Sequence, residues 1–228
     1  MLIMRYLVGS IIGILIGQCI YSQVDSIDFI KYTSDFQFKE GLYLNFDNLK
    51  NNSPLPKSRI ISETNYNDPE FFDKVLAKSK VYYYDNIGNR NELNPNKIWG
   101  YSRNGFIYIN IENEFFRITS IGSICHFIAS HTTYYTEHYN NYSYYNSYYD
   151  PYYLPPTSYP NVEMRQYVLD FKTGRVLDYN YESIEVILMQ DPELHDEYTA
   201  LSKKKKKQLK FVYIRKFNEK NPLYFPKN

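Results

Sequence analysis

Cysteine is nearly absent from this 228-residue chain, so disulfide bonds cannot be what holds it together. The two cysteines are Cys19 and Cys125. If the N-terminal segment that carries Cys19 is removed, Cys125 is the only thiol left and no internal disulfide can form. Residues 23–228 are long enough for one ordinary domain, which must then be stabilised by its own hydrophobic core.

Long hydrophobic runs are also missing, with one exception at the N-terminus. Residues 1–22 contain one charged side chain, Arg5, followed by twelve largely apolar residues, 6–17. This pattern predicts a signal peptide cleaved after Ser22, because the run is shorter than the about 20 apolar residues of a transmembrane helix. An uncleaved membrane anchor and a lipoprotein modified at Cys19 are the alternatives. We therefore expect an exported protein of the periplasm, the outer membrane surface or the extracellular space.

The chain lacks an excess of charge of either sign. Its formal net charge is +1, and residues 23–228 hold 25 basic and 25 acidic side chains. A general nucleic-acid binder would need a basic excess, so we expect no nucleic-acid partner. From residue 191 onward, ten Lys/Arg and five Asp/Glu give a local charge of +5, and residues 203–207 are five consecutive lysines. These lysines predict a solvated helix surface. Membrane contact through them, or through an uncleaved N-terminus, is an alternative.

Catalytic signatures are missing as well. The sequence has no Gly-x-Ser-x-Gly elbow, phosphate loop, His-Glu-x-x-His or dinucleotide fingerprint. Cys125 lies in an apolar run and predicts a buried, inert thiol, with His126 on the opposite face of a strand. His126, His131 and His138 invite a metal hypothesis, but the first two are an odd number of residues apart and would point to opposite faces. We predict no catalytic residue, no metal ligand and no cofactor.

What the sequence does contain is a series of short β patterns. Alternating residues predict a strand over 41–46, and further strands are expected at 59–62, 81–84, 98–102, 106–110, 115–121 and 124–129. Asn104-Gly105 predicts a tight hairpin, since both residues tolerate positive φ. Another hairpin is expected around residues 172–174, between strands at 162–171 and 175–178. Gly122 suggests a bulge or bend.

Helical patterns are concentrated after residue 180. Ile184, Ile187 and Leu188 share one helical face, and Asp191-Pro192 predicts the start of a second helix. Ser202 is expected to begin a third helix that runs through Phe217. An earlier short helix is expected from Asp68 to Lys78, with Asp68 as N-cap. The predicted fold class is α+β, an antiparallel meander or small, partly open barrel with C-terminal helices at about 181–220 packed on it.

Tyrosine is the most unevenly distributed residue. Residues 134–159 hold 11 of the 27 tyrosines, mixed with Asn, Ser and Pro. We interpret residues 130–160, approximately, as a low-complexity insertion in the single domain 23–228. Alternatively, the insertion is a recognition surface for a glycan or peptide, because tyrosine rings give amphipathic contact area at low entropy cost. Self-association is a third interpretation.

Aromatic side chains supply the candidate ligand contacts. The central strands contribute Trp99 and Tyr101, although such residues are more often sheet core. The insertion contributes its paired tyrosines, which are Tyr144, Tyr145, Tyr148, Tyr149, Tyr152 and Tyr153.

Four short segments stand out, which in order along the chain are GLYLNFDNLKNNSP (41–54), KIWGY (97–101), DFKTG (170–174) and KFNEKNP (216–222). Together they resemble a family of uncharacterised exported proteins of Bacteroidota-type bacteria. The resemblance implies an envelope or secreted protein with a signal peptide. It implies no activity and no catalytic residue, and the tyrosine-rich insertion departs from the family pattern.

The function expected from the sequence is a non-catalytic envelope or secreted protein with a binding or structural role, partnered by an envelope glycan or protein. A glycan- or peptide-binding module that uses the insertion is the first alternative. A hydrolase whose site assembles from distant positions is the second.

Overall fold

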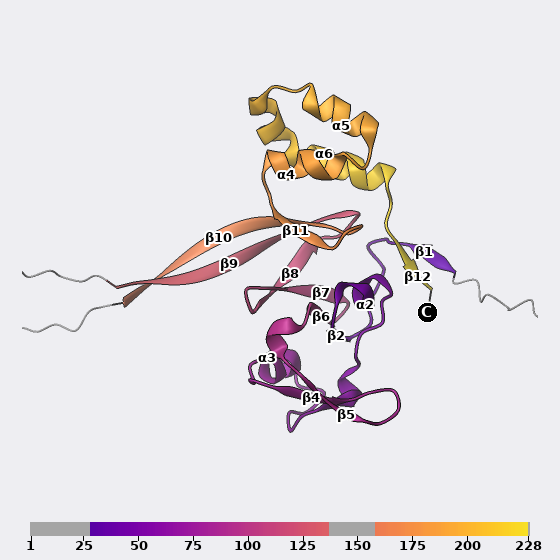
Figure 1. Ribbon diagram of the computed structural model, residues 1–228, viewed down its shortest axis with the longest axis vertical. Coiled ribbons are helices and arrows are strands. Elements are labelled where there is room, and N and C mark those ends of the chain that lie inside the picture. Colours follow the sequence, from indigo (N-terminus) through magenta and orange to yellow (C-terminus); the bar gives the residue numbers. More distant parts are fainter. Residues whose placement is uncertain (1–27, 137–157, 228) are drawn as a thin grey trace, which may run out of the picture.

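The structure is a computed structural model that describes residues 28–136 and 158–227. The fold is α+β, as predicted, and its centre is a seven-stranded antiparallel sheet curled into a half-barrel (Figure 1). In spatial order β11-β10-β9-β8-β7-β6-β2, the strands are β11 (Arg175–Asp178), β10 (Ser158–Asp170), β9 (Ile124–Thr136), β8 (Glu114–Ser120), β7 (Phe106–Ile111), β6 (Gly100–Arg103) and β2 (Gly41–Tyr43).

Strands β6 to β11 form a meander, in which each strand pairs with the next one in sequence. The hairpin predicted at Asn104-Gly105 is confirmed, with φ angles of 52° and 77°. The turn predicted around residues 172–174 is also confirmed, and Gly174 adopts a φ of 75°. The bend expected at Gly122 is confirmed between β8 and β9, and a register shift lies just before it, between Ile118 and Ser120. Local turn chemistry thus accounts for most of the sheet.

The predicted strand over 41–46 is too long. Strand β2 ends at Tyr43, and α2 (Phe46–Lys50) begins where the side chain of Asn45 accepts a hydrogen bond from the backbone of Asn48. The strand ends early because Asn45 caps the helix, and a cap is as strong a local signal as alternation. Both faces of β2 are buried.

A small sheet of order β3-β4-β5 packs against the end of the half-barrel that is formed by β6 and β2. Its strands and the neighbouring helices are β3 (Ile60–Ile61), β4 (Val81–Tyr84), β5 (Arg90–Leu93), α3 (Phe71–Leu76), η1 (Lys57–Arg59) and η2 (Pro95–Lys97). Helix α3 is shorter than the helix predicted from Asp68 to Lys78. Its N-cap is Glu70, because the Asp68 carboxylate accepts the Glu70 N–H in a local turn before the helix.

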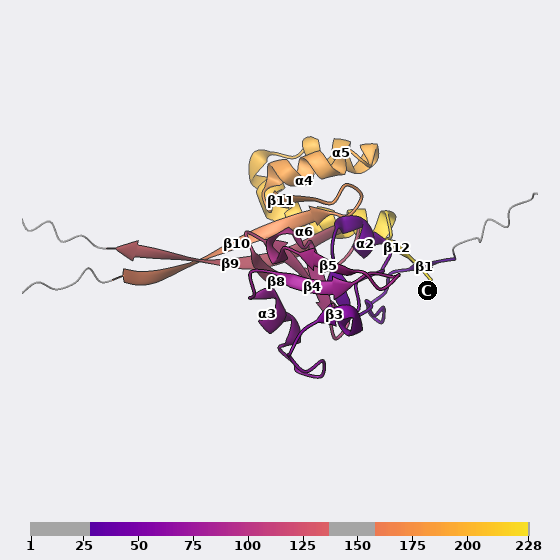
Figure 2. The ribbon, with the colours of Figure 1, turned by 60° about the horizontal axis from the view of Figure 1, so that its bottom comes forward.

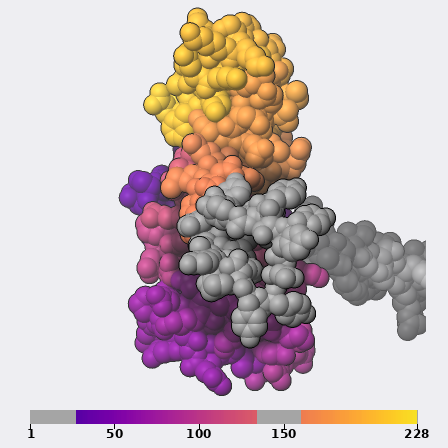
Figure 3. Space-filling model, turned by 90° about the vertical axis from the view of Figure 1, so that its left-hand side faces the viewer, coloured from indigo at the N-terminus to yellow at the C-terminus, as the bar shows by residue number. Residues whose placement is uncertain are grey.

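Three C-terminal helices pack on the β9–β10 end of the sheet, through Ile124 and Val168, at the opposite end of the molecule from the small sheet (Figure 3). They are α4 (Tyr181–Leu188), α5 (Pro192–Thr199) and α6 (Lys203–Lys220). The start predicted for the second helix is confirmed, since the Asp191 side chain accepts the Leu194 N–H and Pro192 is the first helical residue. Ser202 is the N-cap of α6 without a side-chain hydrogen bond, and the helix extends past Phe217 to Lys220.

The two ends of the described chain pair with each other. Strand β1 (Phe29–Lys31) lies antiparallel to β12 (Tyr224–Pro226) beside the C-terminus of α6. The central residue of β12, Phe225, is fully buried and packs on Phe36, Phe38 and Phe171. This aromatic cluster fastens the terminal ribbon to the main core.

Strands β9 and β10 continue beyond the rest of the sheet as a two-stranded arm (Figures 1 and 2). Strand β11 pairs only with residues 167–170, and β8 pairs only near residues 126–127. The arm extends to Thr136 and Ser158, so regular pairing reaches into the insertion predicted at about 130–160. Alternation was hard to recognise there because residues 160–166 are exposed on both faces of β10 and need no apolar face.

Candidate ligand-binding groove

The structure does not bring the two sequence-predicted strand residues together. Trp99 is partly buried against the main core, with its ring 5.7 Å from that of Phe46. Tyr101 is only 2% exposed and stacks between the rings of Phe72 and Tyr108, at centroid distances of 4.9 and 4.7 Å. Trp99 precedes β6 and packs on the main core, whereas Tyr101, inside β6, packs on the core shared with α3 and the small sheet, so the two rings lie in different cores.

Burial also determines the chemistry of Tyr101. Its hydroxyl donates a hydrogen bond to Asp73, and burial, followed by the nearby Asp73 charge, raises the pKa of the phenol above its ordinary value. This side chain therefore offers almost no surface to a ligand. The six insertion candidates, from Tyr144 to Tyr153, lie outside the described residues.

A better candidate site is a groove of about 500 Å³ that sequence reasoning missed. It lies where the C-terminus of α6, the β1–β12 ribbon, α2 and the β10–β11 turn meet. Its apolar walls include Phe171, Phe217 and Leu223. The volume falls within the range of about 300–1,000 Å³ that is typical of small-ligand sites.

Two aromatic rings stand on the β1–β12 side of the groove. Phe29 is 61% exposed and Tyr224 is 51% exposed. In the ribbon, Lys31 is paired with Tyr224 and Phe29 with Pro226, so the two rings are diagonal neighbours on one face. Large exposed rings lose water when a ligand covers them, which makes this rim favourable for apolar or stacking contacts.

Two lysines supply the charge of the groove. Lys50 is the last residue of α2, and Lys172 lies in the β10–β11 turn. Neither ammonium is part of an ion pair within the described residues, and no Asp or Glu of that part of the chain lines the groove. The groove is therefore positively charged, although the chain as a whole is nearly neutral.

Asp170 fixes the position of Lys172 without facing the groove as a free charge. Its carboxylate accepts hydrogen bonds from the Lys172 N–H (3.0 Å), the Thr173 hydroxyl (2.7 Å) and the Gln190 side-chain amide (3.1 Å). Asp170 is 6% exposed. One buried carboxylate thus fixes the backbone at Lys172 and the side-chain amide of Gln190, since buried charges are retained where they are hydrogen-bonded.

Four uncharged polar side chains complete the lining, those of Asn51, Ser123, Gln190 and Asn221. Asn221 ends α6 and donates its amide hydrogens to Asp191 and to the Phe217 carbonyl, while the Ser123 hydroxyl donates to the Asn221 carbonyl. Gln190 donates to Asp170. These bonds use the NH₂ groups, so the Asn221 and Gln190 side-chain oxygens face no donor among the described residues and can accept hydrogen bonds from a ligand.

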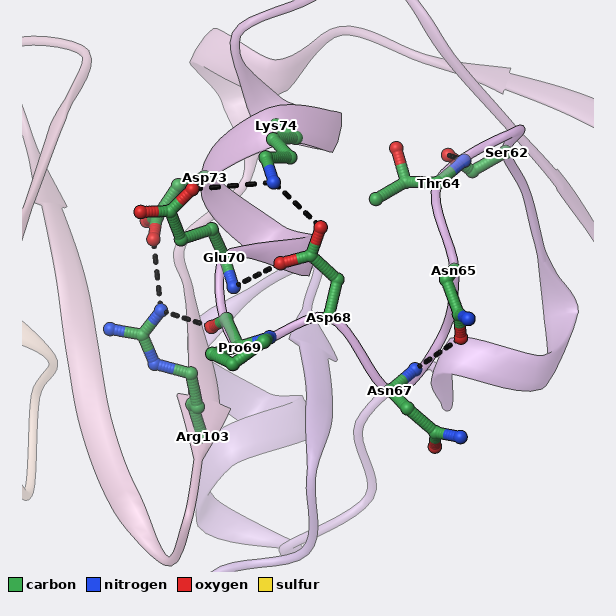
Figure 4. A network of polar contacts seen from close by, with 10 residues as sticks. All are labelled: Ser62, Thr64, Asn65, Asn67, Asp68, Pro69, Glu70, Asp73, Lys74 and Arg103. Atoms are coloured by element: carbon green, nitrogen blue, oxygen red, sulfur yellow. Dashed lines mark hydrogen bonds and ion pairs between the residues drawn. The ribbon is translucent and has the colours of Figure 1, made fainter.

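A second cleft, of about 530 Å³, lies near α3 and is richer in charge (Figure 4). Its charged groups are already paired within the protein. Arg103 binds Asp73 and the Pro69 carbonyl, both at 2.8 Å, and Lys74 binds Asp68 at 2.6 Å. The Lys74 hydrogen bond holds the pKa of the Asp68 carboxyl below its usual value. These contacts hold the loop before α3 in place. They also pair the charged groups of the cleft with one another, so that few are available to a ligand.

The groups with reactive potential lie apart from the groove. Cys125 is 1% exposed, and burial raises the pKa of its thiol to about 12. His126 contacts Tyr179 and Phe211 on the helix-covered face, whereas His131 contacts Phe116 and Tyr167 on the other face. The opposite orientation of these two histidines is as predicted. Residues 28–136 and 158–227 contain no cluster of three potential metal ligands, and His138 lies outside them.

Comparison with protein-family models, with curated proteins and with solved structures finds no match to this chain. None of the helices in the described ranges is long and apolar enough to cross a membrane. The groove is therefore the feature of the described residues that bears most directly on function.

Proposed function

We propose that the protein is exported and acts as a non-catalytic binding protein of the cell envelope or the extracellular space, with the groove as its ligand site. Export is supported by residues 1–22, which have the charge and apolar run of a signal peptide. The observation that carries the binding role is a pair of lysines, Lys50 and Lys172, that have no ion-pair partner within residues 28–136 and 158–227 and lie beside exposed rings in one groove.

The chemistry of the groove favours binding over catalysis. Among its described lining residues, the polar groups are two ammonium groups, amides and a hydroxyl, with no carboxylate, imidazole or thiol to act as general base. The Ser123 hydroxyl is already engaged in donating to the Asn221 carbonyl. Such a set can neutralise, orient and hydrogen-bond a ligand.

Export is tested by the intact mass of the native protein in fractionated host cells. We expect a species that begins at Gln23 in a non-cytoplasmic fraction. A full-length chain in the cytoplasm would contradict the proposal, and a lipid-bearing species at Cys19 would replace the cleaved signal by a lipid anchor.

Binding is tested by thermal-shift screening of envelope glycans and peptides against the purified protein and a Lys50→Gln/Lys172→Gln variant. We expect ligands that raise the melting temperature of the parent protein and have a smaller effect on the variant. Ligands that stabilise both proteins equally would place the binding site outside the groove.

The tyrosine-rich segment is the second candidate. The observation that favours it is the arm, which ends at Thr136 and Ser158, far from the β1–β12 ribbon (Figure 1). Residues 137–157 therefore join the fold at the far end of the arm. The two candidate binding regions can be removed separately.

A further inference from the structure

We propose that the groove binds acidic polysaccharide, with carboxylated sugar units seated between the two lysines and the aromatic rim. This inference rests on the proposed function, because it names the ligand class of the same groove. It follows from three properties of the lining, which are its charge, its rings and its hydrogen-bond acceptors.

The charge of the groove selects an anion. Lys50 and Lys172 come from separate elements, and their ammonium groups have no carboxylate partner in the described part of the chain. Asp170, the acid nearest to Lys172 along the sequence, is nearly buried and accepts hydrogen bonds from three neutral donors rather than from the Lys172 ammonium. A carboxylate of the ligand would form an ion pair with each ammonium. Because the groove is open to solvent, the two ammonium groups would lose only part of their hydration on binding.

The rings select a ligand with a flat apolar face. A sugar ring presents a row of C–H groups, which carry partial positive charge and stack on the negative face of an aromatic ring. Phe29 and Tyr224 are diagonal neighbours on one face of the ribbon, each more than half exposed. Such a rim can hold consecutive sugar units of one chain.

The acceptors distinguish a sugar from a simple organic acid or a lipid. The side-chain oxygens of Gln190 and Asn221 are oriented by internal hydrogen bonds that occupy their NH₂ groups. Their natural partners are hydroxyl donors, which sugars carry on every unit. A fatty acid or inorganic anion would leave these oxygens without a partner.

The volume indicates more than one sugar unit. The groove measures about 500 Å³ and lies at the surface between four separate segments. A site of this size normally holds a ligand larger than a single sugar ring. We therefore infer that a short stretch of a longer chain is bound.

The test is calorimetric titration of the purified full chain, or its processed form, with trigalacturonic acid at low salt. Maltotriose is the neutral comparison, and an acetylated, amidated triglutamate peptide is the acidic comparison without sugar rings. We expect binding of trigalacturonic acid that weakens at high salt, with maltotriose and the peptide each at least about tenfold weaker.

Two variants test the individual contacts. Lys50→Gln/Lys172→Gln should lower the affinity for trigalacturonic acid about tenfold or more, and Tyr224→Ala should lower it severalfold through lost stacking. The matched control is Lys204→Gln/Lys205→Gln, which removes the same charge from an exposed part of α6. Equal losses in the lysine variant and the control would show nonspecific charge attraction and overturn the proposal.

The remaining outcomes separate this inference from the proposed function. Tighter binding of the peptide, with loss in Lys50→Gln/Lys172→Gln, would keep the groove as a binding site and overturn the sugar class. Equal binding of maltotriose and trigalacturonic acid would overturn the role of charge. If none of the three probes binds, acidic sugar is overturned, and the thermal-shift screen still decides whether the groove binds another ligand.

Discussion

Asn218 on α6 and Ile124 on β9 are joined by two hydrogen bonds that imitate the pairing of neighbouring strands. The Asn218 side-chain oxygen accepts the Ile124 N–H at 2.7 Å, and its amide nitrogen donates to the Ile124 carbonyl at 2.9 Å. A Cβ on Gly122 would lie 2.4 Å from the Asn218 amide, so only glycine permits this approach. One side chain thus attaches the last helix to the sheet next to the groove.

Replacement of Asn218 by Ala should destabilise the protein by about 2 kcal/mol, because two partly buried backbone groups lose their partner. The measurement is urea denaturation followed by circular dichroism. Gln208→Ala, on an exposed position of the same helix, is the control and should change the stability by less than about 0.5 kcal/mol. Equal stability of the two variants would mean that water replaces the Asn218 contacts.

Asp191 should make the stability depend on pH. Its carboxylate binds Lys220 at 2.9 Å and the Asn221 amide at 3.2 Å, and the Lys220 hydrogen bond, followed by that from Asn221, holds its pKa below the ordinary value. Because the pKa is lower in the folded state, the stabilisation is present above the ordinary pKa of about 4 and is lost as the pH falls through the lowered value.

Asp191→Asn removes the charge and keeps a residue that caps helices well. Urea denaturation should show the parent protein to be more stable than the variant at pH 7, with the difference shrinking below about pH 4. Glu219→Gln, at an exposed residue 3.9 Å from Arg215, is the control and should have a small effect at both pH values. A constant difference for Asp191→Asn across this pH range would contradict the assigned pKa shift.

Cys125 should be inert in the folded protein. Its thiol is buried, its pKa is raised to about 12, and its Sγ donates to the Gly122 carbonyl. In a Cys19→Ser chain at pH 8, we expect no reaction with Ellman's reagent in native buffer and one reactive thiol in guanidinium chloride. Rapid reaction of the native protein would show that the β9 face opens readily.

The outer arm should be dispensable for the fold. The backbone N–H of Tyr179 donates to the Gln166 carbonyl, so the backbone groups of even-numbered β10 residues point toward β11. Those of odd-numbered residues therefore point toward β9, which makes Asn161 and Thr133 a hydrogen-bonded pair. A two-residue turn fits such a pair, so residues 134–160 can be replaced by Asn-Gly. We expect the melting temperature to change by only a few degrees, since residues 134–136 pair only with 158–160 among the described strands.

The same replacement separates the two candidate binding regions. If the groove is the ligand site, the shortened protein should bind the same ligands with unchanged affinity in the thermal-shift screen. Loss of binding, with the fold retained by circular dichroism, would assign the function to the tyrosine-rich segment.

Sequence predicted the parts of this fold that depend on neighbours in the chain. The Asn104-Gly105 hairpin and the start of α5 at Asp191-Pro192 were both confirmed, because turn and capping geometry involves only a few consecutive residues. It failed where two local signals compete, as at Asn45, whose capping interaction ends β2 before the alternation does.

By itself, then, the sequence determined the α+β class, the meander and the C-terminal helices, because periodicity and turn residues encode them locally. Only the tertiary structure decided that Tyr101 is core and that Lys50, Lys172 and Tyr224 share one groove. Those residues lie on elements widely separated in sequence, and their proximity results from the pairing of β1 with β12 and from the packing of α6 on the sheet. Long-range pairing of this kind depends on the burial of the whole core, which no short pattern records.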